Sequence, residues 1–206
     1  MVPPSALPGR IVFEDDQAHP PEKGPKPRLE LRTVDPVNAE PASSDVTADG
    51  LFQLTGVQPA RYRVMLSWNS AYVKAVTLGS NQMEGNVLHL RNGSAGAPLT
   101  VLLSSAFGSI TGNVSDRDIP VAGARIVLLR DDFVSLGDVT FVVSEESGSY
   151  SIPNVRPGKY RLAPIDENDG GPRAGNVDDY EDVLVRVDVQ PKDKLTRDLK
   201  RHSPVQ

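Results

Sequence analysis

Apolar and polar residues alternate along many short stretches of the chain. In residues 61–68 the even positions carry Tyr, Val, Leu and Trp, whereas the odd positions include two Arg and a Ser. Val occupies every odd position of 183–189. A period of two is typical of β-strands that bury one face, and helical periodicity is hard to find. The pattern predicts strands at 9–14, 28–34, 45–48, 51–56, 61–68, 72–78, 86–91, 98–105, 109–115, 124–130, 138–145, 149–154, 159–166, 182–190 and 194–200.

One pattern occurs twice. Residues 49–64 and 147–162 share Gly, an aromatic residue, an aliphatic residue, Val, Pro, Tyr and Arg, in the same order and without an insertion. A repeat of this kind indicates a duplicated architecture. We therefore expect two β domains of roughly 100 residues each, which is a usual domain size. The predicted divisions are an N-terminal arm at 1–8, a first domain at 9–106, a second domain at 107–200 and a C-terminal tail at 201–206.

The repeated residues are explained by turns and core packing. The Asp-Gly pair at 49–50 and the Ser-Gly pair at 147–148 suit hairpin turns, where Gly tolerates a positive φ. The aromatic and aliphatic residues that follow lie two positions apart and should face inward. Tyr62 and Tyr160 should bury their rings and bond their hydroxyls to nearby backbone, as in a tyrosine corner. The motif itself is therefore expected to be structural.

Three stretches of the second copy carry a family resemblance. They are Gly112-Asn113-Val114, the run from Pro120 to Leu128, and the run from Gly148 to Tyr160. The last two follow the patterns P-x-x-G-A-x-V-x-L and G-x-Y/F-x-I…V-x-P-G-x-Y, and the stretch from Gly50 to Tyr62 carries the likeness in the first copy. The chain thus resembles the carboxypeptidase regulatory-like domain family and the related transthyretin-like and Cna-B-like β-sandwiches.

The resemblance implies an all-β protein made of two tandem seven-stranded Greek-key sandwiches of the Ig-like, prealbumin or carboxypeptidase-regulatory-like kind. It also implies an extracytoplasmic bacterial setting, either secreted or at the cell surface. In such settings these modules flank enzymes, receptors or adhesive proteins.

Composition excludes several classes of function. The net charge is -5, so the basic footprint of a nucleic-acid-binding protein is missing. The chain has no cysteine, which excludes disulfides, thiol nucleophiles and metal sites of the cysteine type. No apolar run approaches the ~20 residues of a membrane span. The first eight residues lack the charged start and apolar stretch of a signal peptide, and we favour a segment of a longer secreted protein over a cytoplasmic one.

The sequence offers little for catalysis. His19 and Glu22 have the H-x-x-E spacing of some zinc peptidases, but two prolines separate them in a Pro-rich, charged loop. A catalytic zinc needs three ligands on rigid elements, and the only other histidines are His89 and His202. No Ser and carboxylate are marked as partners of His89 for a nucleophilic triad. We expect no enzymatic activity and no cofactor.

The long acidic loop at 166–182 is the one candidate for a metal. Its first residues have the look of a calcium loop, but Gly170 stands where an EF-hand requires an oxygen ligand. Two interpretations stay open, a solvated acidic loop and a calcium site of another kind. The weak calcium candidates are Asp166, Asp169, Asp178 and Asp179.

Three aromatic residues are candidates for ligand binding. Trp68 and Tyr72 flank a short turn, and Tyr180 lies in the acidic loop. Exposed rings of this kind stack on sugars, but Trp68 has the parity of the buried row in its strand, which favours burial.

Two functional hypotheses follow. The first is a noncatalytic module that recognises a glycan or a protein through end loops such as 67–72, 131–138 and 166–182. The second is a structural subunit of an extracellular assembly or filament, in which edge strands pair between copies or terminal arms exchange. The Pro-rich N-terminus and the basic tail at 192–202 are the candidate arms. Function is expected where the copies differ, at the 17–27 loop, the 67–72 turn and the acidic loop.

Overall fold

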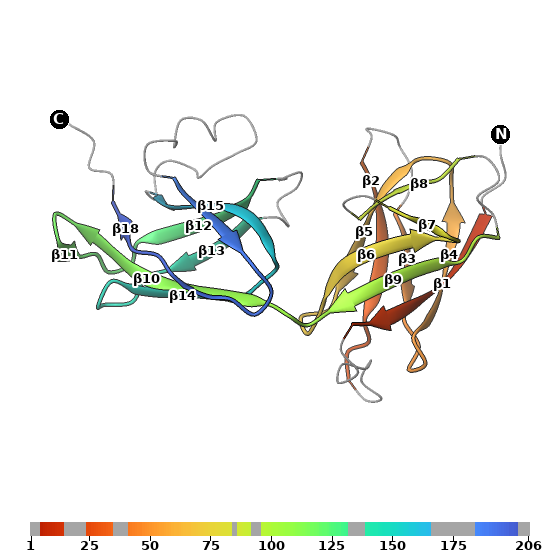
Figure 1. Ribbon diagram of the computed structural model, residues 1–206, viewed down its shortest axis with the longest axis horizontal. Coiled ribbons are helices and arrows are strands. Elements are labelled where there is room, and N and C mark those ends of the chain that lie inside the picture. The colour runs from red at the N-terminus through yellow and green to blue at the C-terminus, as the bar shows by residue number, and fades with distance from the viewer. Residues whose placement is uncertain are drawn as a thin grey trace. The chain divides into compact units, whose positions relative to one another are not determined.

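The computed structural model describes residues 5–14, 24–34, 41–83, 86–91, 96–131, 139–165 and 184–201. These residues form strands, turns and loops, with no helix among them (Figure 1). The chain divides into two compact units, residues 1–105 (unit 1) and residues 106–206 (unit 2). The all-β fold expected from the alternation is confirmed, as is the sandwich that the family resemblance implies.

Unit 1 is built from a five-stranded sheet in the order β4-β1-β9-β6-β7 and a four-stranded sheet in the order β3-β2-β5-β8. Its strands are β1 (Ser5–Phe13), β2 (Arg28–Thr33), β3 (Ala42–Asp45), β4 (Leu51–Val57), β5 (Arg61–Ser67), β6 (Tyr72–Leu78), β7 (Asn81–Gln82), β8 (Val87–His89) and β9 (Leu99–Ser104).

Unit 2 repeats this plan. One sheet has β10 at its centre, flanked by β14 on one side and by β17 and β18 on the other, with β11 at one end. The second sheet has the order β13-β12-β15-β16. The strands are β10 (Gly108–Asp116), β11 (Ile119–Pro120), β12 (Arg125–Arg130), β13 (Val139–Val143), β14 (Ser149–Val155), β15 (Gly158–Ile165), β16 (Val185–Val189), β17 (Lys194–Thr196) and β18 (Leu199–Lys200).

The two units share seven strands with the same pairing. In each, the first strand pairs antiparallel with the strand of the repeated motif and parallel with the last strand. Unit 1 has the β6–β7 pair in addition to the seven strands expected, and unit 2 has β11. The last strand of unit 2 is divided into β17 and β18. The position in unit 2 that corresponds to β6 and β7 falls between β15 and β16, outside the described residues.

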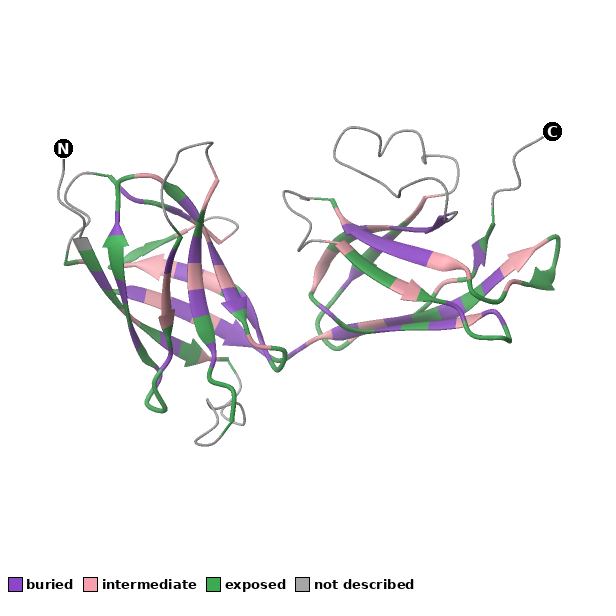
Figure 2. Cartoon of the chain, turned by 180° about the vertical axis from the view of Figure 1, so that it is seen from behind, coloured by how far each residue is buried: buried purple, intermediate pink, exposed green. Residues whose placement is uncertain are grey.

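Each unit has its own apolar core between its two sheets. Buried and exposed residues alternate along the strands, as Figure 2 shows in purple and green. In the repeated motif, Phe52 and Leu54 are buried in unit 1, and Tyr150 and Ile152 are buried in unit 2. The inward orientation expected for these residues is confirmed.

Both tyrosine corners are present. The Tyr62 hydroxyl donates to the Gln58 carbonyl at 3.0 Å and accepts from the Gln58 N–H at 3.3 Å. The Tyr160 hydroxyl donates to the Arg156 carbonyl at 2.7 Å. Because the phenol bonds to backbone four residues upstream, each buried ring also fixes the turn that leads into its strand.

A glycine faces the aromatic residue of the motif in each unit. Gly9 pairs with Phe52, and Gly112 pairs with Tyr150. A Cβ atom at Gly9 would lie 2.3 Å from the Phe52 ring and 2.6 Å from the Leu99 carbonyl oxygen. At Gly112 it would lie 1.8 Å from the Arg197 carbonyl oxygen. The first strand therefore needs a glycine at this position, because the aromatic ring and the backbone at the end of the unit leave no room for a Cβ atom.

Two sequence-based boundaries are wrong. β1 begins at Ser5, so part of the expected N-terminal arm belongs to the sheet. β3 ends at Asp45, because Thr47 instead opens a turn in which the Gly50 N–H donates to its carbonyl at 2.9 Å. The strand predicted at 194–200 is present as β17 and β18, which pair with β10, and exchange of the basic tail between copies stays a prediction. The rest of that tail lies outside the described residues.

Gly112→Ala should destabilise unit 2 by about 3 kcal/mol, because the new methyl group meets backbone rather than a movable side chain. Urea unfolding of the full chain measures the loss, and Thr111→Ala on the same strand is the control. Equal midpoints for the two variants would contradict the close approach.

Tyr150→Phe should remove an alkaline sensitivity of unit 2. Burial raises the pKa of the Tyr150 phenol, and the Asp198 carboxylate raises it further. The folded state thus keeps a proton that the unfolded state releases above about pH 10, so stability is complete below that pH and falls as pH rises. Calorimetry between pH 8 and pH 11 should show this fall in the wild type.

The same calorimetry should show a weaker fall in the Tyr150→Phe variant. The variant loses a hydroxyl that donates to the Arg197 carbonyl, so it should be about 1 kcal/mol less stable at neutral pH. Unit 1 is an internal control because Phe52, which has no hydroxyl, stands at the matching position. Tyr150→Phe should therefore leave the pH dependence of unit 1 unchanged. Identical pH profiles for wild type and variant would count against the buried phenol as the cause.

Candidate functional site

The described residues hold no group of three or more acidic or histidine side chains arranged to bind a metal. His89 is exposed at the end of β8. Within the described part of the chain, no helix is long and apolar enough to cross a membrane. The calcium candidates Asp166, Asp169, Asp178 and Asp179 all lie outside the described residues, so the calcium site stays a prediction.

The two aromatic candidates that the structure describes, Trp68 and Tyr72, do not form an exposed platform. Tyr72 is only 6% exposed, so its ring is not available to stack on a ligand. Trp68 is partly buried against the core of unit 1, and its ring meets the Phe13 ring edge-to-face with centroids 5.8 Å apart. Tyr180 lies outside the described residues. The burial favoured for Trp68 by its parity agrees with this packing.

A pocket of about 180 Å³ opens beside the tyrosine corner of unit 2. The Arg130 guanidinium lies over the Tyr160 ring, 5.5 Å from its centroid, and donates to its hydroxyl at 3.3 Å. Asn154 and Arg156 also line the pocket, and Asn154 has a positive φ of 54°. Among the described residues, the charged side chains of the lining are Arg130 and Arg156, so this part of the pocket is cationic.

The outer faces of the two four-stranded sheets differ far more than the cores do. In unit 1 this face is polar. Arg28 on β2 pairs with Asp45 on β3 at 2.9 Å, and Arg32 pairs with Glu30 at 2.7 Å. Such exposed ion pairs add little stability, but they keep the face solvated.

In unit 2 most of the matching positions are apolar, although Arg125 stands at the Arg28 position and Arg161 pairs with Asp131 at 3.1 Å. Glu30 faces Ser43 and Met65 across the strands of unit 1, and in the same register Val127 faces Phe141 and Ala163 in unit 2. Val127 and Ala163 are fully buried and Ile165 is 7% exposed, which makes a second apolar cluster on the side away from the main core. Phe141 and Val143 are 48% and 59% exposed. We call the following residues the outer patch: Val127, Val139, Phe141, Val143, Ala163 and Ile165.

A cation–π contact accompanies the outer patch. The Arg125 guanidinium lies 5.6 Å from the centroid of the Phe141 ring. Arg125 occupies the position of Arg28 in unit 1, but it faces Val143 where Arg28 faces Asp45. The same arginine position therefore makes an ion pair in one unit and a cation–π contact in the other.

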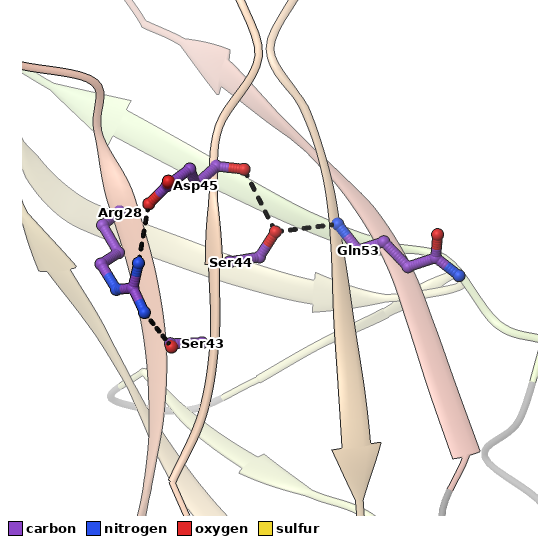
Figure 3. A network of polar contacts seen from close by, with 5 residues as sticks. All are labelled: Arg28, Ser43, Ser44, Asp45 and Gln53. Atoms are coloured by element: carbon purple, nitrogen blue, oxygen red, sulfur yellow. Dashed lines mark hydrogen bonds and ion pairs between the residues drawn. The ribbon is translucent and has the colours of Figure 1, made fainter.

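The edge strands next to these faces also differ. Figure 3 shows the polar contacts of β3, which is an edge strand of unit 1. The Arg28 guanidinium bonds to both Asp45 and Ser43, at 2.9 and 2.6 Å. The Ser44 hydroxyl accepts the Gln53 N–H of β4 at 3.3 Å and thus ties β3 to the other sheet. The equivalent strand in unit 2, β13, has the sequence Val-Thr-Phe-Val-Val and no polar network of this kind among the described residues.

The sequence-based search placed function in loops and missed these strands. Two signals were present. Residues 126–129 of β12 are four consecutive apolar residues, which is typical of a strand buried on both faces. Residues 141–143 of β13 are also consecutive apolar residues, so the alternation fails there. Of the loops proposed as sites, 132–138, 166–182 and most of 17–27 lie outside the described residues.

No protein-family model matches the chain, and no curated protein does. Among solved structures, it is similar to the Bacillus anthracis TIE protein at 11% identity and a TM-score of 0.37, over 96% of this chain and 34% of that one. It is similar to the Streptococcal ancillary pilin at 11% identity and a TM-score of 0.42, over 97% of this chain and 62% of that one. It is similar to GBS52, the minor pilin of Streptococcus agalactiae, at 12% identity and a TM-score of 0.46, over 98% of this chain and 100% of that one.

These similarities are distant. The chain spans about a third of the first of these proteins and less than two thirds of the second. The resemblance to the carboxypeptidase regulatory-like domain family stays a prediction.

Trp68→Ala should act on stability. Losing half-buried aromatic packing should cost unit 1 about 2 kcal/mol, roughly half the value for a fully buried Trp. Thermal unfolding measures the loss, and Gln53→Ala, at an exposed position, is the control. A Trp68→Ala variant that is as stable as the control would show that this ring is not part of the core.

Proposed function

We propose that the chain is a noncatalytic structural module of a secreted or cell-surface bacterial protein, and that it assembles with other protein chains, including further copies, through unit 2. One observation carries this proposal. Two units with the same topology and register have opposite outer faces, solvated in unit 1 and apolar in unit 2. The secreted or surface setting is supported by the family resemblance of the repeated motif.

Unit 1 shows that the fold does not require an apolar outer face. Charged residues on β2 and β3 are compatible with the same sheet and the same kind of core. Exposed Phe and Val side chains are unfavourable in water, and burying them returns roughly 25 cal/mol per Å² of apolar surface. Val127, Ala163 and Ile165 are already buried within the chain, whereas Phe141 and Val143 are exposed. These two side chains are therefore best explained by a surface that covers them, as exposed apolar groups that cluster usually mark interaction sites.

The chemistry of the patch suits a protein partner. Aromatic and arginine side chains are enriched at the energetic centres of protein interfaces, and Phe141 with Arg125 provides one of each.

Glycan recognition is the second candidate function. It requires exposed aromatic rings, whereas Tyr72 is buried and Trp68 packs on Phe13. Tyr180 is the remaining aromatic candidate. A glycan array with reproducible hits that Tyr180→Ala abolishes would move this candidate into first place.

The double variant Phe141→Ser, Val143→Thr should reduce self-association. For the wild type, the mass from light scattering should rise above the monomer value of 22.2 kDa as concentration increases. The double variant should stay at that mass over the same range. Leu51→Ser is the matched control, since Leu51 is exposed to a similar extent, 50%, but belongs to unit 1.

Circular dichroism of each variant checks that the fold is retained. A wild type that remains monomeric at every concentration would refute assembly from further copies. A loss of association caused equally by Leu51→Ser would show that the patch on unit 2 has no special role.

A further inference from the structure

The strand β13 is an unprotected edge. It hydrogen-bonds to β12 on one side, and no other described strand pairs with it. Its five residues include no charged residue, no proline and no glycine. Proteins normally protect edge strands with charge, proline, bulges, short length or a cover, because a free edge is a template for another strand.

The other edges of both units carry such protection among the described residues. In unit 1, β3 is tied to β4 through Ser44, and the opposite edges are only two or three residues long. In unit 2, β14 contains Pro153 and β16 contains both Arg186 and Asp188. Lys194 and Lys200 stand on β17 and β18. The apolar edge of β13 is therefore the exception.

The backbone of β13 has hydrogen-bonding groups directed to this free edge. The Ser144 N–H, directly after β13, donates to the Ala124 carbonyl at 2.9 Å, toward the β12 side. Because successive residues of a strand turn their N–H and C=O groups to opposite edges, the groups of Val143, Phe141 and Val139 face away from β12.

The strand is also complementary to itself. Its residues on the outer face are Val139, Phe141 and Val143, which give the same order, Val-Phe-Val, in either direction. An antiparallel copy centred on Phe141 places each Val beside the other Val and the two Phe rings side by side. Cross-strand aromatic and β-branched pairs are among the most favourable, and no like charges meet.

We infer that β13 is a docking edge for a second copy of this chain, with the two β13 strands antiparallel about a twofold axis at Phe141. The two four-stranded sheets then become one continuous sheet. On its outer face the row Ala163, Val127, Phe141 of one copy continues into the same row of the other. A strand with a twofold pattern pairs with itself by symmetry, which is the usual basis of a closed dimer.

This inference rests on the proposed function, because it names the surface through which copies assemble. It also specifies a register that cysteine cross-linking can test, since the chain has no cysteine of its own. In the twofold register the two Cα atoms at position 141 lie about 5.5 Å apart, as in a hydrogen-bonded antiparallel pair. That separation is within the range of a disulfide.

Phe141→Cys should therefore form a disulfide-linked dimer on mild oxidation with diamide. Val143→Cys alone should not, because its two copies lie about 14 Å apart, four residues at ~3.4 Å each. A mixture of Val139→Cys and Val143→Cys chains should give the mixed dimer and little of either homodimer. This mixture keeps Phe141 and so does not depend on the tolerance of that position.

Val143→Lys tests the same pairing by weakening the dimer. It places a charge at the edge and should raise the dimer dissociation constant at least tenfold with an unchanged circular dichroism spectrum. Leu51→Lys, at a similarly exposed position of unit 1, should leave the constant unchanged.

The outcomes separate the two proposals. Self-association without a cross-link in the Phe141→Cys variant and without an effect of Val143→Lys would overturn the β13 pairing and leave the proposed function standing. A chain that is monomeric at every concentration would overturn both. Homodimers of Val143→Cys as abundant as those of Phe141→Cys would overturn the register.

Discussion

Each unit depends on the close approach of its last strand to its first strand. The approach is possible because a glycine stands at the point of contact, Gly9 in unit 1 and Gly112 in unit 2. The space beside each glycine is filled by an aromatic ring from the repeated motif, Phe52 or Tyr150. A glycine without the ring would leave a gap, and a ring without the glycine would have no room. The two features are therefore one packing unit, and this explains why both occur in each copy.

That packing unit leaves the outer faces of the sheets unconstrained. Leu31 and Leu128 hold matching positions and are both buried in the main cores of their units. Glu30 and Val127, one position earlier on the same strands, point the other way and differ completely in character. Two units of this topology can thus have similar cores and yet differ on their outer faces.

Sequence reasoning was most successful where a local pattern determines the structure. The period-two alternation placed most strands to within a few residues, because burial of one face acts on every second residue. It was wrong at β3, where Thr47 bonds through both its backbone and its hydroxyl to close a turn that alternation does not reveal. The character of the outer face was harder to predict. The sequence places strands near 124–130 and 138–145, but it does not show that Phe141 lies opposite Val127 and beside Arg125, because that arrangement depends on the register between strands separated by a loop.

The parallel pairing of the first and last strands has a mechanical consequence. In unit 1 the register runs without a break from Gly9 with Leu99 to Phe13 with Leu103. In unit 2 the first strand is held in the same sense by β17 and then by β18. Tension applied to the two ends of a unit pulls these parallel neighbours along each other, so their hydrogen bonds are loaded together in shear rather than opened one at a time. Each unit is therefore constructed to resist stretching along the chain, which is the load that a structural module between two attachment points must carry.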